Sequence, residues 1–263
     1  MNPTSPETVL VTGASSGIGL ELAHSFAADK STLVLVARNT PALEKLAVEL
    51  RSQHGITVHV LTADLSLPES PRKIFSELEG RGITVDVLIN NAGFGLQGTF
   101  ASLSLPRQLE IIQVNIIALT ELTGLFLPGM LKRKRGGILN VGSVAGFLPG
   151  PNMAIYYASK AFVQSFTEAL AEETAGSGLH ISVLCPGPTE SNFGIVARDG
   201  RTRSVQTPRM SARAVAEFGR RKFRAGRVVA VPGALNRLFV FSPRILPRSM
   251  VRKTVKRYNR PIE

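Results

Sequence analysis

The sequence predicts an α/β protein, a doubly wound parallel sheet of about seven strands in a single domain. Short apolar runs alternate along the chain with longer segments of helical periodicity, which is typical of a parallel sheet covered by helices on both faces. The chain has 263 residues, 44% of them hydrophobic, which is enough for one such domain with a sizeable core.

The apolar runs expected to form strands lie at 8–12, 32–37, 56–61, 85–89, 137–142, 180–185 and 227–231. Long helices are expected between them, including 105–133 and 153–175. The chain shows no internal repeat and no low-complexity tract.

A glycine-rich turn follows the first strand and leads directly into the first helix. It reads Thr12-Gly13-Ala14-Ser15-Ser16-Gly17-Ile18-Gly19. Gly13 permits a tight turn, Gly17 a close approach of the backbone to a pyrophosphate, and Gly19 close packing of helix and strand. The helix N-terminus then offers free N–H groups to phosphates. We expect this turn, with Ser15, Ser16 and Ile18, to bind a dinucleotide; the alternative is an ordinary strand–helix turn.

The residue at the end of the second strand indicates which dinucleotide is expected to bind. A carboxylate there would bind a ribose 2′-hydroxyl, but Ala37 has none and Arg38 offers a guanidinium that can bind a 2′-phosphate. NADP is therefore favoured over NAD. The alternative is that Arg38 is merely solvated.

Tyr156 and Lys160 are four residues apart in a predicted helix and so share one face. A phenol exchanges protons poorly at neutral pH, because its unperturbed pKa is about 10. A neighbouring ammonium favours the phenolate, so we expect Lys160 to lower the pKa of Tyr156. The pair is a candidate acid–base catalyst.

Further motifs follow the glycine-rich turn in order: Asp64-Leu65, Asn90-Asn91-Ala92-Gly93, Asn115, Ser143, the Tyr156/Lys160 pair and Pro186-Gly187. With these motifs the chain resembles the short-chain dehydrogenase/reductase family. The resemblance extends from about Glu7 to Ser191, and more loosely to Pro232. The resemblance implies a Rossmann fold, adenine contact at Asp64 with Leu65 beside it, and a cofactor site lined by Asn91, Ala92 and Gly93.

The resemblance also implies a catalytic set of Asn115, Ser143, Tyr156 and Lys160. In this set Ser143 holds a carbonyl oxygen and Tyr156 protonates it. Lys160 holds the nicotinamide ribose, and Asn115 orders a water that returns the proton through Lys160. After Pro186-Gly187, either Thr189 or Ser191 is expected to contact the nicotinamide carboxamide, because the chain departs here from the usual spacing.

The composition is consistent with a cytoplasmic protein. The one cysteine, Cys185, excludes an internal disulfide and lies in an expected core strand. The N-terminal residues are polar, so we expect no secretory signal. The longest apolar stretch, 116–131, is interrupted by Glu121 and Pro128, so we expect no membrane-spanning helix. No metal site is expected.

The positive charge is concentrated in the C-terminal part. Residues 198–263 hold 18 basic and three acidic residues, whereas the whole chain carries a net charge of +12. We expect a catalytic domain at 1–234, with a substrate lid near 192–210, and a basic amphipathic extension at 235–263 that is broken at Pro243 and Pro247. This extension could lie on an anionic membrane, form a subunit interface or cover the pocket. Nucleic-acid binding is not expected, since no base-reading motif accompanies the charge.

These observations predict an NADP(H)-dependent oxidoreductase that interconverts a hydrophobic ketone or aldehyde with its alcohol, as a homodimer or homotetramer. Apolar residues near the catalytic motifs favour such a substrate: Phe94, Phe147, Leu148, Pro149, Pro151 and Met153. The basic extension is equally compatible with an acidic acyl thioester of coenzyme A. The alternative function is a non-catalytic NADP-binding sensor or scaffold that works through protein partners.

Overall fold

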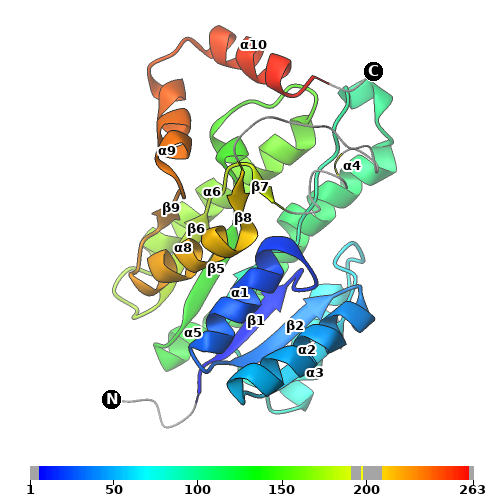
Figure 1. Ribbon diagram of the computed structural model, residues 1–263, viewed down its shortest axis with the longest axis vertical. Coiled ribbons are helices and arrows are strands. Elements are labelled where there is room, and N and C mark those ends of the chain that lie inside the picture. Colours follow the sequence, from blue (N-terminus) through cyan, green and yellow to red (C-terminus); the bar gives the residue numbers. More distant parts are fainter. Residues whose placement is uncertain (1–5, 191–196, 198–208, 261–263) are drawn as a thin grey trace.

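The computed structural model describes residues 6–190, 197 and 209–260 and shows a seven-stranded parallel sheet between two helical layers (Figure 1). The strand order is β3-β2-β1-β4-β5-β6-β9. The strands are β1 (Thr8–Thr12), β2 (Thr32–Ala37), β3 (Val58–Thr62), β4 (Val87–Asn90), β5 (Gly137–Val141), β6 (His180–Leu184) and β9 (Val229–Ala230). The predicted fold class is confirmed. The strand order reverses between β1 and β4, which is where ligands bind in such sheets.

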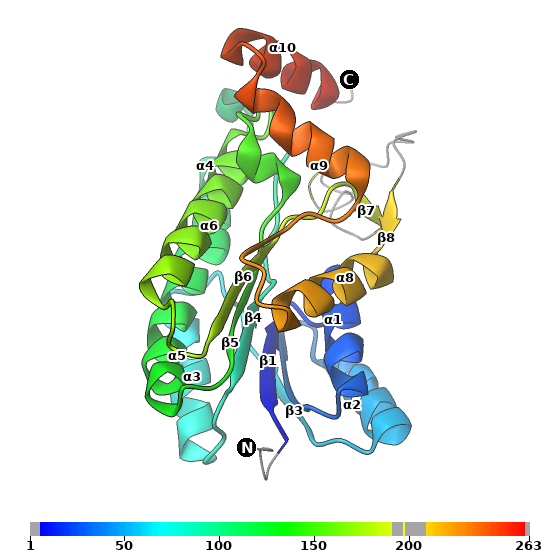
Figure 2. The ribbon, with the colours of Figure 1, turned by 90° about the vertical axis from the view of Figure 1, so that its left-hand side faces the viewer.

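The helices divide between the two faces of the sheet (Figure 2). One layer contains α1 (Gly17–Ala28), α2 (Thr40–His54) and α8 (Ala212–Arg224); the other contains α3 (Ser70–Gly80), α5 (Leu119–Arg133) and α6 (Ala154–Glu173). Along β1, Val9 and Val11 pack into the first layer and Leu10 into the second. This alternation follows from the two-residue period of a strand.

The helix expected at 105–133 is continuous but changes its winding in the middle. It consists of α4 (Leu105–Ile112), a π-helical segment η2 (Gln113–Ala118) and α5. By length and composition alone, these 29 residues are sufficient to cross a membrane, despite the interruptions at Glu121 and Pro128. Leu122, Phe126 and Met130 are nevertheless buried against the sheet, so we assign the segment to the helical layer.

The C-terminal extension forms two helices at the end of the molecule far from the N-terminus (Figure 2). They are α9 (Ala234–Phe241) and α10 (Arg248–Tyr258), joined by the short η4 (Ser242–Arg244). The breaks fall at Pro243 and Pro247, where proline was expected to interrupt the helix. The segment expected to form a lid, 192–210, lies outside the described residues except for positions 197, 209 and 210. It is flanked by β7 (Thr189–Glu190) and β8 (Met210–Ser211), which pair with each other.

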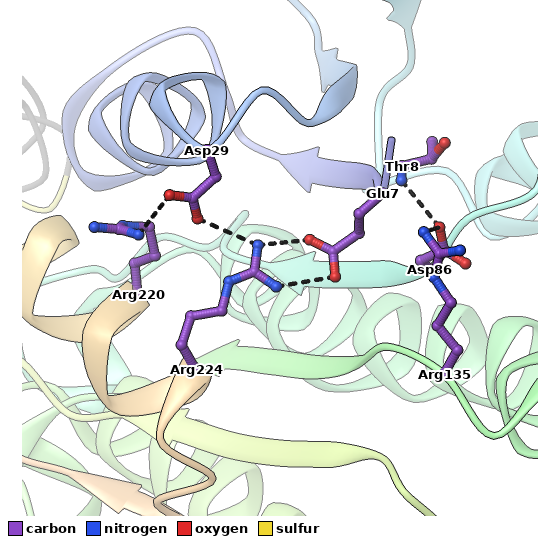
Figure 3. Close-up of polar contacts among 7 residues, drawn as sticks. All are labelled: Glu7, Thr8, Asp29, Asp86, Arg135, Arg220 and Arg224. Atoms are coloured by element: carbon purple, nitrogen blue, oxygen red, sulfur yellow. Dashed lines mark hydrogen bonds and ion pairs between the residues drawn. The ribbon is translucent and has the colours of Figure 1, made fainter. Parts of the chain in front are cut away.

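Ion pairs connect the basic helix α8 to Glu7, just before β1, and to Asp29, at the end of α1 (Figure 3). Arg224 binds both carboxylate oxygens of Glu7, at 2.9 and 2.6 Å, and lies 3.3 Å from Asp29. Arg220 donates to Asp29 at 2.7 Å. The Arg224 guanidinium also lies 4.9 Å from the ring centroid of Phe26. Part of the positive charge of the C-terminal region is therefore structural.

We expect Phe223→Ala to lower the free energy of unfolding by about 3–5 kcal/mol, the usual cost of emptying a core aromatic site. Phe223 is 1% exposed, and its ring centroid lies 6.2 Å from that of Phe26. Phe218, on the same helix, is only partly buried, so Phe218→Ala should cost less. Denaturant unfolding of both variants checks this; equal losses would contradict the packing described.

Candidate active site

The glycine-rich turn is held against the end of β4 by two polar side chains. The hydroxyl of Thr12 donates to the Ile89 carbonyl at 3.2 Å and accepts from the amides of Asn91 and Ala92 at 3.0 and 3.1 Å. The Asn91 side chain donates to the carbonyls of Thr12 and Gly13 at 2.9 and 3.2 Å. Asn91 therefore shapes the turn, and Thr12 is a positioning residue that the sequence analysis did not single out.

The turn leaves space that side chains would fill. Gly13 and Gly17 have φ angles of 65° and 58°, which favour glycine. A Cβ on Gly19 would lie 2.3 Å from both the Asn91 side chain and the Gly13 carbonyl oxygen. Ser16 precedes α1 without a side-chain cap, so the first amides of this helix remain available to a phosphate. The residues therefore fit a dinucleotide, with Ser15 and Ile18 in the same turn.

Arg38 extends from the end of β2 with 73% of its side chain exposed. Its guanidinium lies 3.9 Å from the Asp64 carboxylate, which also accepts from the amide and hydroxyl of Ser66 at 2.9 and 2.8 Å. Burial opposes ionisation of Asp64, but the Ser66 hydrogen bonds and the charge of Arg38 outweigh it and lower its pKa. Leu65 is buried in the core, so only Asp64 of this pair presents a polar group.

Ser143, Tyr156 and Lys160 come together where β5 ends. Ser143 lies just beyond β5, hydrogen-bonds to the side chain of Tyr156, and accepts from the Ala145 amide at 3.1 Å. Lys160 lies one turn after Tyr156 on α6 and donates to the Val141 carbonyl at 2.7 Å. Its Nζ lies 5.9 Å from the Tyr156 ring centroid. The sequence-predicted group is therefore assembled in space.

The pKa of Tyr156 departs from the sequence-based expectation. Burial raises it to about 12, and the Ser143 hydrogen bond offsets this only in part. Burial also lowers the pKa of Lys160 to about 8, because an ammonium away from water loses its hydration. In the protein alone, desolvation is therefore the largest influence on both pKa values. Tyr156 is held in its protonated form.

Asn115 occupies the π-helical segment and binds the strand–loop junction after β4. Its side-chain oxygen accepts from the Phe94 amide at 3.1 Å, and its Nδ2 donates to the Phe94 carbonyl and to Ser159, both at 3.0 Å. A Cβ on Gly93 would lie 2.9 Å from this oxygen and 3.5 Å from Nζ of Lys160. The Asn115 side chain therefore fixes the loop next to Lys160, and its expected role in ordering a water stays a prediction.

A small cavity of about 10 Å³, with room for little more than one water molecule, adjoins Tyr156, and most of the residues around it are apolar. The lining includes Leu96, Phe100, Leu103, Ile111, Met153 and Tyr156. Of the apolar residues expected near the substrate, only Met153 is among the lining residues. Phe147 and Leu148 instead pack against α10, and Phe94 packs under Arg107. The segment before α4 was not identified from the sequence, because its apolar residues show no regular period.

The C-terminal helix α10 is fastened beside the catalytic helix. Val251 and Val255 are buried against Leu148 and Tyr157. Asn259 is 3% exposed, accepts from the Tyr157 hydroxyl at 3.3 Å, and donates to the Pro151 carbonyl at 3.1 Å. The Tyr157 ring packs edge-on against Tyr156, with centroids 6.0 Å apart. Tyr157 therefore connects α10 to the candidate catalytic residue, and the sequence analysis missed this role of Asn259.

The loop after β6 also contacts Ser143. Pro186 is buried, and its carbonyl accepts from Ser143 at 3.5 Å. A Cβ on Gly187 would lie 2.3 Å from the Asn236 side chain of α9. The Thr189 hydroxyl donates to the Gly187 carbonyl at 2.9 Å, while Ser191 lies outside the described residues. Cys185, just after β6, is fully buried.

Residues 7–201 match the family model described as short chain dehydrogenase. This chain belongs to the short-chain dehydrogenase/reductase family. The match includes the glycine turn, the Ser143, Tyr156 and Lys160 group, and the loop after β6.

Members of this family with similar sequences or structures have been described. The chain is 33% identical over 218 residues to the ketoacyl reductase HetN of Nostoc sp., covering 82% of this chain and 76% of that one. It is 28% identical to the very-long-chain 3-oxoacyl-CoA reductase of Rattus norvegicus, over 100% of this chain and 82% of the relative. A short-chain dehydrogenase from Sphingobium yanoikuyae in complex with NADPH superposes with a TM-score of 0.82 at 32% identity, covering 90% of this chain and 93% of that one.

We expect the buried Lys160 of this short-chain dehydrogenase to make its stability depend on pH. The pKa of Lys160 is about 8 in the folded protein, whereas an ordinary lysine, as in the unfolded chain, has a pKa of 10.5. Between these values the unfolded chain holds more protons, so stability rises with pH over this window. Relative to Lys160→Met, the free energy of unfolding should increase by about 2 kcal/mol from about pH 8 to about pH 10. Both proteins contain Tyr156, so its contribution to the pH dependence cancels in the difference between them. A constant difference across this range would contradict a desolvated Lys160.

Proposed function

We propose that the chain is an NADP(H)-dependent oxidoreductase that interconverts a hydrophobic ketone or aldehyde with its alcohol. The observation that carries this proposal is the hydrogen bond between Ser143 and the side chain of Tyr156, with mostly apolar residues next to Tyr156. Two neighbouring hydroxyl groups can both hydrogen-bond to one carbonyl oxygen.

In this proposal Ser143 orients the carbonyl oxygen and Tyr156 gives it a proton. NADPH, when bound, supplies the hydride that completes the reduction. The raised pKa of Tyr156 keeps the phenol protonated at neutral pH, which suits reduction. Oxidation of the alcohol requires the phenolate and is therefore favoured by higher pH. Lys160 binds the cofactor ribose and carries the proton that restores Tyr156, since a pKa of about 8 lets its ammonium release one.

The preference for NADP rests on Arg38. Its guanidinium is exposed and lies beyond β2, on the side of the glycine turn where the adenosine ribose binds in such folds. The Asp64 carboxylate lies 3.9 Å from this guanidinium, which has enough N–H donors to bind a 2′-phosphate as well. The NADPH complex of the Sphingobium relative supports the same choice.

We propose a lipid-like substrate, because the residues next to Tyr156 include the apolar side chains of Leu96, Leu103, Ile111 and Met153. The Nostoc and rat relatives are named for the reduction of ketoacyl and 3-oxoacyl-CoA groups, so we propose a 3-oxoacyl chain within this class. A set of 3-oxoacyl thioesters and bulky apolar ketones, assayed with NADPH, tests this choice. Turnover of small polar ketones alone would contradict it.

We further propose a cytoplasmic location and a homodimer or homotetramer. The oligomer is supported by exposed apolar side chains on the outer helices, where Ile117 and Phe162 are 45% and 37% exposed. The Phe162 ring stacks on Phe166 with centroids 5.6 Å apart, which gives this face a rigid apolar surface. Light scattering in solution checks the assembly, and a monomeric mass would contradict it.

We expect Tyr156→Phe to lower kcat by about 100- to 10,000-fold, the usual contribution of a general acid. NADPH affinity should stay near that of the parent protein, because only the hydroxyl is removed. Tyr157→Phe is the matched control: it loses the bond to Asn259 and should reduce stability by about 1 kcal/mol while largely retaining turnover. If Tyr157→Phe were the more damaging change, the proton donor would be misassigned. NADPH binding without turnover of any carbonyl would favour a sensor instead.

We expect Arg38→Gln to remove the preference for NADPH over NADH. A charge-assisted hydrogen bond is worth about 1.5–3 kcal/mol, so the NADPH affinity should fall about tenfold or more while that of NADH changes little. Arg72→Gln, on α3 with a side chain 75% exposed, controls for the loss of a surface charge. Fluorescence titration of both cofactors measures the effect. Equal affinities in the parent protein would contradict the role of Arg38.

A further inference from the structure

The α9–α10 segment presents an apolar surface that the rest of the described chain does not cover. We call it the terminal surface. Its apolar members have exposed fractions between 41% and 76%; they are Leu235, Leu238, Phe239, Phe241, Ile245, Leu246 and Met250. None of the residues of α9 is buried, although five of its eight residues are leucine, phenylalanine or valine. Single exposed apolar residues are common, but a run of this kind marks an interaction site.

All the charged residues of this segment are basic. From 234 to 260 the chain has eight basic residues and no acidic residue. Those interspersed with the apolar members are exposed, namely Arg237, Arg244, Arg248, Arg252, Lys253, Lys256 and Arg257. The ion pairs of the described chain involve none of these seven, in contrast to Arg220 and Arg224 of α8. The occupant of the terminal surface must therefore be both anionic and able to receive apolar side chains.

The terminal surface is held in place rather than left as a free tail. α10 turns Val251 and Val255 inward, and the buried Asn259 bonds to Tyr157 and to the Pro151 carbonyl. At the other end, the Asn236 side chain packs closely on the loop after β6, where a Cβ on Gly187 would lie 2.3 Å from its oxygen. Because both ends are anchored, the apolar side chains are presented without the entropy cost of folding the segment on contact.

We propose that the terminal surface docks on an anionic membrane, with its apolar side chains inserted at the headgroup boundary and its cations on the lipid phosphates. An anionic bilayer combines an apolar interior with a negative surface, and it attracts basic amphipathic segments. A second copy of this chain would bring an equally basic surface into contact, which disfavours self-association here. The pocket residue Phe100, itself 56% exposed, belongs to the loop before α4, and α4 lies at the same end of the molecule (Figures 1 and 2).

Sedimentation with vesicles tests the proposal without any substrate, so its outcome is independent of the proposed reaction. The parent protein should bind vesicles of phosphatidylcholine containing phosphatidylglycerol, and not vesicles of phosphatidylcholine alone. High salt should weaken this binding by about tenfold or more, since exposed charges are screened. The double variant Leu238→Glu, Phe241→Glu should lose it, while both positions are exposed enough to tolerate the change. Val48→Glu on α2, at a position 63% exposed, is the matched control and should bind like the parent.

Each other result overturns the proposal. Failure of the parent protein to bind anionic vesicles excludes a membrane surface. Binding that survives in the double variant shows that charge alone holds the protein, without insertion. A change of oligomeric mass in the double variant, with no vesicle binding by the parent, assigns the terminal surface to a second copy of the chain.

Discussion

The burial of one ammonium group, that of Lys160, is the constraint on which the rest of the site depends. Lys160 is 6% exposed and its Nζ has the Val141 carbonyl at 2.7 Å. A buried cation is costly unless acceptors and space are provided. β5 provides the acceptor at its carboxyl end, and Gly93 leaves room for the neighbouring Asn115, because a Cβ there would lie 2.9 Å from the Asn115 side-chain oxygen. The low-dielectric surroundings that lower the pKa of Lys160 also hold the proton on Tyr156.

The fold meets this constraint by fixing α6 against the end of β5. Beneath the site, a buried amide of Asn90 donates to Asn140 at 2.9 Å, and Asn140 donates to Thr167 of α6 at 2.9 Å. These bonds join two neighbouring strands to the helix that carries Tyr156 and Lys160. Polar groups buried in this way are strongly directional, so they set the position of the helix along the strand. The parallel register then brings the ends of β1, β4, β5 and β6 to one edge, where the glycine turn and Ser143 also lie.

Local patterns in the sequence predicted the fold class and which residues lie together at the candidate site. Apolar runs located the strands to within a few residues, and the spacing of Tyr156 and Lys160 placed them on one face of α6. What the sequence could not predict depends on contacts between distant segments. Asn259 meets Tyr157 across 102 positions, and no local signal marks either residue as a partner of the other. The predicted direction of the Tyr156 pKa shift was wrong for the same reason. The sequence shows the charge of Lys160, whereas the burial that raises the pKa of Tyr156 exists only after folding.

The most direct test of this account is the ionisation of Tyr156 itself. The chain has three tyrosines and no tryptophan, so near-ultraviolet absorbance reports tyrosinate formation with little interference. Titration of the parent protein, with the Tyr156→Phe curve subtracted, isolates the one phenol. A desolvated site predicts that Tyr156 remains protonated beyond the ordinary value of 10.0 and ionises near pH 12 or only on unfolding. Ionisation of this phenol below pH 10.0 in the cofactor-free protein would show that the charge of Lys160, and not burial, controls the site.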